Sequence, residues 1–133
     1  MKKTRPPKQK NKYYLPKHEY WMTVHFCMNY GEYKKQLAEL DGQKALVLDG
    51  MPHGTETSDP TAVIAEKRAK LQGKIDIIEN AIREVDASLY DYLLLGVTTD
   101  ASYGYLSDLG MPCGKDYYIK RYREIYYKIA KEI

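Results

Sequence analysis

A regular apolar spacing between residues 60 and 86 constrains the fold of this chain more than any other feature. The seam steps by four, three, four and three residues through Leu71, Ile75, Ile78, Ile82 and Val85, and Ile64 extends it backwards. This is the spacing of one face of an α-helix that packs against a neighbour. Ser58-Asp59-Pro60 precedes the seam as a helix start, because a side-chain oxygen can cap the first turn and proline fits there. The seam predicts a helix over 60–86.

A second amphipathic pattern predicts a helix over 17–40, with Pro16 at its start. Its apolar positions are Met22, Phe26, Tyr33, Leu37 and Leu40, and Gly31 lies inside it as a point where it could bend. We expect the two helices to pack antiparallel as a hairpin, closed by a loop over 41–58 in which 45–48 could be extended. Because the seam covers only about two heptads, this packing is favoured over pairing with a second subunit. A homodimer is the alternative.

Shorter patterns predict the remaining helices. A third helix is expected over 88–96, followed by a short helix over 102–109 and a final helix from 115 to the C-terminus. In the break between the last two, Gly110 can adopt a positive φ and Met111 can fill the corner between the helices. This order of elements is typical of a helix-turn-helix.

The expected fold class is therefore all-α, a long helical hairpin followed by a C-terminal helix-turn-helix. We expect three regions along the chain. They are a disordered basic arm over 1–12, the hairpin plus third helix over 13–98, and a DNA-binding helix-turn-helix segment over 99–133.

Positive charge is concentrated at the two ends of the chain. Residues 1–17 carry seven Lys or Arg and no acid, and residues 113–133 carry six Lys or Arg against three acids. The intervening residues 18–112 carry eight against fifteen. A protein that approaches a polyanion would use such segregation, whereas solubility alone does not require it. A basic tail without a partner is the alternative for residues 1–12.

The final helix has two faces. Tyr118, Tyr122, Ile125 and Ile129 form a core stripe, which Ile119, Tyr126 and Ile133 widen. The first turns of the second helix in a helix-turn-helix enter the major groove of DNA, where Lys and Arg donate to guanine or phosphate and Tyr to phosphate. The predicted DNA-binding residues are Lys115, Asp116, Tyr117, Lys120, Arg121, Arg123 and Lys128, the last two contacting the backbone. The basic arm adds Lys2, Lys3, Arg5, Lys8, Lys10 and Lys12. Basic residues near the end of this helix could also simply complement its dipole.

The sequence predicts no enzyme, no cofactor and no metal site. His18 and His25 lie seven residues apart with Cys27 nearby, and no further ligands converge on them. Cys113, close to a helix start, could have a lowered thiol pKa, yet the sequence names no base for a nucleophile. No stretch approaches the ~20 apolar residues of a membrane span. Two distant cysteines without a disulfide framework favour a reducing cytosol.

Tyrosine is unusually frequent, with fourteen against one phenylalanine. Pairs occur at 13–14, 117–118 and 126–127. They could form an amphipathic surface for DNA or a partner, or fill a small core whose rim is exposed. The sequence leaves both interpretations open.

Three motifs together resemble those of a group of small proteins encoded by phages and prophages of Gram-positive, especially clostridial, bacteria. The first runs from Lys12 to His18, and the second joins Gly50–Thr55 to Asp59-Pro60-Thr61. The third is the turn and helix start from Met111 to Tyr118. The group is similar in layout to the RinA/ArpU class of phage transcriptional regulators, in which a helical part precedes a helix resembling region 4 of sigma factors.

This resemblance implies binding to double-stranded DNA and control of phage genes in the cytoplasm of the bacterial host cell, with host RNA polymerase as a further expected partner. The alternative is a non-enzymatic protein-interaction module, in which the hairpin binds a phage or host protein during assembly, packaging or inhibition. Clustering of the basic residues of the final helix with the N-terminal arm would favour the first interpretation. An apolar patch on the hairpin would favour the second.

Overall fold

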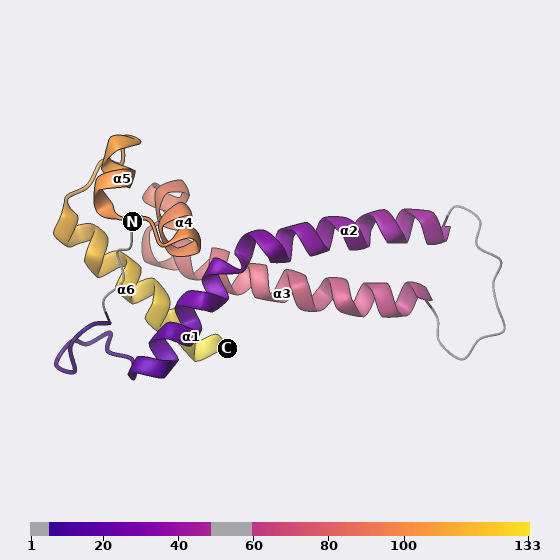
Figure 1. Ribbon diagram of the computed structural model, residues 1–133, viewed down its shortest axis with the longest axis horizontal. Coiled ribbons are helices and arrows are strands. Elements are labelled where there is room, and N and C mark those ends of the chain that lie inside the picture. The colour runs from indigo at the N-terminus through magenta and orange to yellow at the C-terminus, as the bar shows by residue number, and fades with distance from the viewer. Residues whose placement is uncertain (1–5, 49–59) are drawn as a thin grey trace. The chain divides into compact units, whose positions relative to one another are not determined.

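The computed structural model describes residues 6–48 and 60–133, and the elements found there are all helical (Figure 1). The helices are α1 (Lys17–Met28), α2 (Tyr30–Leu48), α3 (Pro60–Asp86), α4 (Tyr90–Thr99), α5 (Tyr103–Asp108) and α6 (Lys115–Glu132), and a 3-10 turn η1 (Ala87–Leu89) precedes α4. The predicted all-α class is confirmed.

The chain divides into two compact units. The helical unit comprises the described residues up to Tyr30 together with Ile77–Ile133, and the hairpin unit comprises Gly31–Asp76. This division cuts across the regions predicted at 13–98 and 99–133. The reason is that α1 and the end of α3 pack with the C-terminal helices rather than with the hairpin.

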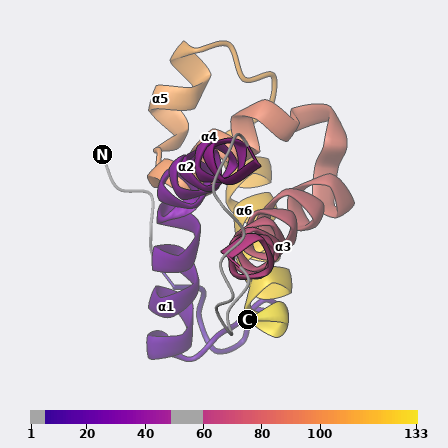
Figure 2. The same cartoon turned by 90° about the vertical axis from the view of Figure 1, so that its right-hand side faces the viewer.

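In the helical unit, α1, α4 and α6 pack against one another in pairs (Figure 2). Each contributes side chains that are almost completely buried, and together these form the core: Tyr20 and Val24 from α1, Leu93 and Val97 from α4, and Tyr118, Ile125, Tyr126 and Ile129 from α6. Ile78 and Ile82 of α3 are also fully buried. The stripe predicted for the final helix is therefore the core face of α6, although Ile133 is 41% exposed and does not belong to it.

The single helix predicted over 17–40 is wrong, because the chain breaks at Asn29 between α1 and α2. Asn29 leaves the helical region, with φ −84° and ψ 3°, while its N–H still bonds the His25 carbonyl. Tyr30 is buried immediately afterwards, and its hydroxyl donates to Glu79 of α3. Packing of Tyr30 thus accompanies the break, and Gly31 lies inside the first turn of α2.

The prediction of which face of α1 is buried is also wrong. Met22 is 55% exposed and Phe26 is only half-buried, whereas Tyr20, Val24 and Cys27 are buried. Apolar residues occur on both faces of α1, so periodicity alone could not select the inward one. Contacts with α4 and α6 make that selection.

In the hairpin unit, the described parts of α2 and α3 lie side by side (Figure 1). Arg68 bonds Asp41 at 2.8 Å, and the Lys74 ammonium lies 5.1 Å from the centre of the Tyr33 ring. The antiparallel hairpin is thus observed for this part of the chain and not for α1. The loop expected from residue 41 starts too early, because 41–48, including the stretch expected to be extended, is helical. The rest of that loop, with the Ser58-Asp59 cap, lies outside the described residues.

The third helix differs from the expected 88–96 at both ends. Asp86 accepts a hydrogen bond from the Ser88 N–H at 3.0 Å and starts η1, after which α4 runs to Thr99. Asp100 then adopts a left-handed conformation with φ 56°, which ends the helix. Gly96 does not end it, contrary to expectation, and instead lies inside α4.

The segment from α5 to α6 has the local geometry expected of it. Gly110 has φ 101°, and the next residue, Met111, is 5% exposed, with its N–H bonded to the Leu106 carbonyl at 3.1 Å. Leu106 is the buried residue of α5, whereas Leu109 is 51% exposed. A glycine-containing turn with a buried following residue therefore connects the two helices.

Candidate functional site

Two tyrosine hydroxyls of α6 fix this helix against the end of α4. Tyr118 donates to the Ala101 carbonyl at 2.8 Å and Tyr126 donates to the Val97 carbonyl at 3.4 Å. Val97 lies in the last turn of α4, where carbonyls lack partners within the helix, and Ala101 lies just after the helix, so both hydroxyls satisfy backbone groups near the C-terminal end of α4. Burial raises the pKa of both phenols well above the usual range. The outward side of α6 is thus held in a defined orientation.

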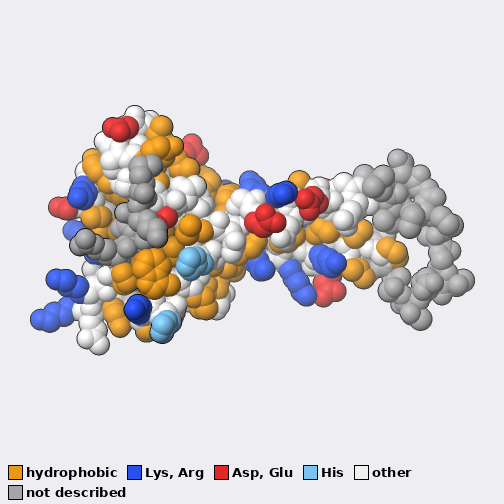
Figure 3. All heavy atoms as spheres, viewed as in Figure 1, with side chains coloured by type: hydrophobic (Ala, Val, Ile, Leu, Met, Phe, Trp, Pro, Cys, Tyr) orange, Lys and Arg blue, Asp and Glu red, His pale blue; other side chains and the backbone are white. Residues whose placement is uncertain are grey.

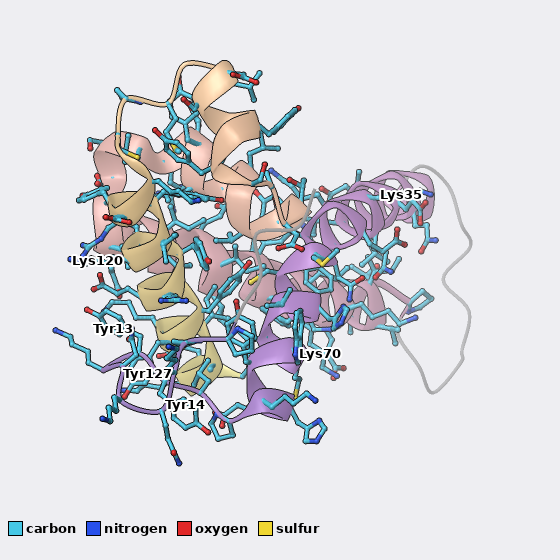
Figure 4. The ribbon with its side chains drawn as sticks, turned by 60° about the vertical axis from the view of Figure 1, so that its left-hand side comes forward. Tyr13, Tyr14, Lys35, Lys70, Lys120 and Tyr127 are labelled. Atoms are coloured by element: carbon cyan, nitrogen blue, oxygen red, sulfur yellow. The ribbon has the colours of Figure 1, made fainter. Side chains whose placement is uncertain are left out.

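The N-terminal segment lies against the outward side of α6. Residues 6–12, expected to be part of a disordered arm, instead include a turn in which the Asn11 N–H bonds the Lys8 carbonyl at 2.8 Å and Asn11 Oδ1 accepts from the Tyr13 N–H. The ring of Tyr13 lies 5.7 Å from that of Tyr127 on α6 (Figure 4). Of the arm residues, Lys2, Lys3 and Arg5 lie outside the described residues. Lys8 and Lys10 are exposed.

A pocket of about 330 Å³ lies between this turn and α6. Its lining residues are Asn11, Lys12, Tyr13, Lys120, Arg121 and Arg123. Four of the six are cationic and none is acidic. Among the described residues, the buried Nε atoms of Arg121 and Arg123 have no hydrogen-bond acceptor. We call this the cationic pocket.

On the side of α6 nearer to α3, the basic and polar side chains have acidic partners. The Tyr117 hydroxyl donates to Asp86 at 2.5 Å, and the Lys128 ammonium lies 3.8 Å from Glu84. The hydrogen bonds from Ser88 and from Tyr117 lower the pKa of Asp86, and the bond to Asp86 raises the pKa of Tyr117. This side therefore carries paired charges. At the cationic pocket, Arg121 is paired with Glu124, which does not itself line the pocket.

The structure brings together some of the predicted DNA-binding residues and separates others. Lys120, Arg121 and Arg123 meet at the cationic pocket, and Lys12 of the arm joins them from the other end of the chain. Arg121 also bonds Glu124 at 3.1 Å, with its guanidinium 5.1 Å from the Tyr117 ring. Lys115 and Asp116 do not line the pocket and are exposed in the first turn of α6.

Sequence reasoning missed Asn11 as part of this surface, and it singled out Tyr13 in the 13–14 pair without linking it to α6. The available signal was the alternation of cations and tyrosines at both ends of the chain. Lys12 lies 5.2 Å from the Tyr13 ring centre and Lys131 lies 4.2 Å from that of Tyr127. Cation–π contacts of this kind hold ammonium groups over aromatic faces.

A second pocket, of about 500 Å³, lies where η1 meets the turn before α6. Its lining residues are Asp86, Ser88, Leu89, Pro112, Cys113, Gly114 and Tyr117. Burial raises the pKa of the Cys113 thiol, with a contribution from Asp86, so the lowered pKa expected from the nearby helix start is wrong. A thiol with a raised pKa is a poor nucleophile.

Within residues 6–48 and 60–133, no group of three His, Cys, Asp or Glu side chains is arranged to hold a metal ion. In the same part of the chain, every helix is too short or too polar to cross a membrane.

Comparisons of the chain with protein-family models, with curated proteins and with solved structures found no match.

Proposed function

We propose that this chain binds double-stranded DNA through the outward side of α6, with the first two turns of the helix in the major groove. The observation that carries the proposal is the cationic pocket, where Lys12 meets Lys120 and Arg123, more than a hundred residues later in the sequence. Segregated positive charge that converges on one surface is the electrostatic footprint of a nucleic-acid-binding protein.

The geometry of α6 supports a groove-binding role. An α-helix with its side chains is ~10–12 Å wide, close to the ~12 Å width of the major groove. Lys115, Asp116 and Lys120 are exposed in the first two turns, where they can reach base edges or phosphates. The Tyr117 hydroxyl donates to Asp86, so its main role is to stabilise the fold rather than to contact DNA. Lys128, paired with Glu84, is a weaker candidate for a backbone contact than Arg123.

A regulatory role in phage gene expression, contact with host RNA polymerase and dimer formation extend this proposal. Their support is the likeness of three sequence motifs to those of small phage and prophage proteins, a group similar in layout to phage transcriptional regulators. The alternative of a protein-interaction module on the hairpin has less support. Val63 is the only large hydrophobic residue of the hairpin unit that is strongly exposed, among those the structure describes there. Figure 3 shows charges of both signs along the visible face of that unit, with hydrophobic side chains between them.

The test is a titration of a labelled 20–30 base-pair duplex with the full chain, at about 50 and 200 mM salt. The test variant is Lys115→Ala/Lys120→Ala. The matched control is Lys35→Ala/Lys70→Ala, which removes the same charge from exposed lysines of the hairpin unit (Figure 4).

We expect the native chain to bind more weakly at the higher salt concentration, because released counterions drive binding to phosphates. Loss of two charge-assisted contacts should weaken the α6 variant by about ten- to a hundredfold. The control should remain within about twofold of the native affinity. Absence of native binding, or an equal loss in both variants, would rule out the proposal.

A further inference from the structure

We infer that the cationic pocket seats one phosphate group, and that the N-terminal turn at residues 8–14 fixes the register of α6 on the duplex. This inference rests on the proposed DNA binding and assigns the chemical group and the segment responsible. A helix-turn-helix alone would leave orientation to contacts of α6 and its neighbours. Here a second segment, remote in sequence, closes one side of the binding surface.

The donors around the pocket match an anion with several acceptor oxygens, such as a phosphate. Lys12 approaches from the turn, whereas Lys120, Arg121 and Arg123 lie within one turn of α6. A phosphate carries several acceptor oxygens and can take hydrogen bonds from donors on different sides at once. The buried Nε donors of Arg121 and Arg123, without acceptors among the described residues, are the groups that would gain most from an anion.

The turn is ordered before any ligand is bound. Asn11 accepts from the Tyr13 N–H at 2.8 Å, and the Tyr14 N–H bonds the Asn11 carbonyl at 3.1 Å. The Tyr13 ring contacts Tyr127, and Lys12 lies over the Tyr13 ring. Because these contacts restrict Lys12 in the free protein, less conformational entropy is lost when it binds an anion.

The same contacts limit which part of α6 can enter a groove. Tyr13 packs against Tyr127, in the second half of the helix, so the N-terminal turn occupies its outward side there. The first half, from Lys115 to Lys120, has no such cover, because its cations face the pocket or solvent. A phosphate held beside Lys120 would therefore place the groove over the first two turns.

The test has two arms, both on the full chain. In the first, inorganic phosphate is titrated into the free protein while NMR signals of the arginine side chains and the backbone are followed. In the second, the salt dependence of duplex binding is measured for Lys12→Ala and for Lys74→Ala. Lys74 is a matched control, because it lies over the ring of Tyr33 much as Lys12 lies over that of Tyr13, but in the hairpin unit.

We expect phosphate to move the signals of Arg121 and Arg123 and of residues 11–13, and Lys12→Ala to weaken that response. With DNA, Lys12→Ala should lower the slope of log affinity against log salt by about one and weaken binding about tenfold, with Lys74→Ala unchanged. Tyr13→Phe, which keeps the ring, should keep the native slope.

The two proposals fail in different ways. If phosphate moves the pocket signals but the native chain binds no duplex, the phosphate site stands and the DNA proposal fails. If the duplex binds but the pocket signals do not move, or the slope is unchanged in Lys12→Ala, the phosphate site is overturned while DNA binding stands. Equal shifts around Lys74 would mean non-specific ion binding and would also overturn the site.

Discussion

Tyrosines on the inward and outward sides of α6 make their contacts with different parts of the side chain. Inward, the hydroxyls of Tyr118 and Tyr126 donate to backbone carbonyls at the end of α4. Outward, the ring of Tyr127 contacts Tyr13 and lies under the Lys131 ammonium. The inward side thus depends on the polar tip, and the outward side depends on the aromatic face.

This difference explains why the chain uses tyrosine where phenylalanine is more usual. The two neighbours in the pairs 117–118 and 126–127 differ in burial. Tyr118 and Tyr126 are buried in the core, while Tyr117 and Tyr127 remain at the surface beside cations. Replacing the hydroxyl should therefore destabilise the fold on the inward side and have little effect on the outward side.

The largest expected loss of stability comes from a substitution at Gly96, which lies against the inward side of α6. A Cβ at Gly96 would overlap the Tyr118 hydroxyl and press on its ring. Gly96→Ala should lower the free energy of unfolding by about 2–4 kcal/mol, because overpacking and a disturbed buried hydrogen bond outweigh the better helix propensity of alanine. Urea unfolding measures this loss of stability. It is monitored through the fluorescence of Trp21, which lies in α1 of the same unit.

A double-mutant cycle checks the cause. In Gly96→Ala/Tyr118→Phe the hydroxyl that meets the new methyl group is gone, so the loss should be smaller than the sum of the single losses. Simple additivity would show that the cost of Gly96→Ala arises elsewhere. Gly104, whose Cβ would meet nothing within 4 Å, provides the control variant Gly104→Ala.

The next effect is that of Tyr118→Phe alone. Removing the hydroxyl leaves the Ala101 carbonyl without this buried donor, which should cost about 1–3 kcal/mol of unfolding free energy. Tyr126→Phe should cost less, because its bond to Val97 is longer, 3.4 Å against 2.8 Å. The same urea titration compares the two, and a loss that is larger for Tyr126→Phe would contradict the ranking.

Local chemistry made the inward side of α6 predictable. The core stripe follows from helical spacing, and the turn before α6 follows from a glycine that takes a positive φ and a buried methionine after it. The seam over Leu71–Ile82 is buried for the same reason. Each of these features is decided by residues within a few turns of one another.

What the sequence could not predict depends on contacts between distant segments. The inward face of α1 is chosen by α4 and α6, since Met22 and Val24 are equally apolar candidates on opposite faces. The candidate site was unpredictable for the same reason, because contacts between distant segments form it. Lys12 and Lys120 were each expected to bind DNA, but only the fold brings them to one pocket, and only the fold pairs Lys128 with Glu84.

Tyr117 is intermediate between the two sides, because it is exposed yet donates its hydroxyl to Asp86. The pKa of Asp86 is lowered in the folded state, so its ionised form stabilises the fold above the unfolded pKa, and this contribution is lost as the pH falls through the folded pKa. Tyr117→Phe removes one of the two side-chain donors and should reduce this acid-side loss. Urea unfolding at a series of pH values between about 3 and 7 measures this loss of stability. Ser88→Ala should also reduce it, and an unchanged pH dependence in both variants would contradict the assignment.

The smallest effect is expected at Tyr127, on the outward side. Its hydroxyl has no hydrogen bond to a described residue, whereas its ring contacts Tyr13 and Lys131. Tyr127→Phe should therefore change the free energy of unfolding by no more than about 0.5 kcal/mol. Tyr127→Ala removes the ring and should release the N-terminal turn, which amide hydrogen exchange at residues 11–14 would detect as faster exchange. If Tyr127→Phe cost as much as Tyr118→Phe, the two sides of α6 would not differ in the way proposed, and the hydroxyl would matter on both.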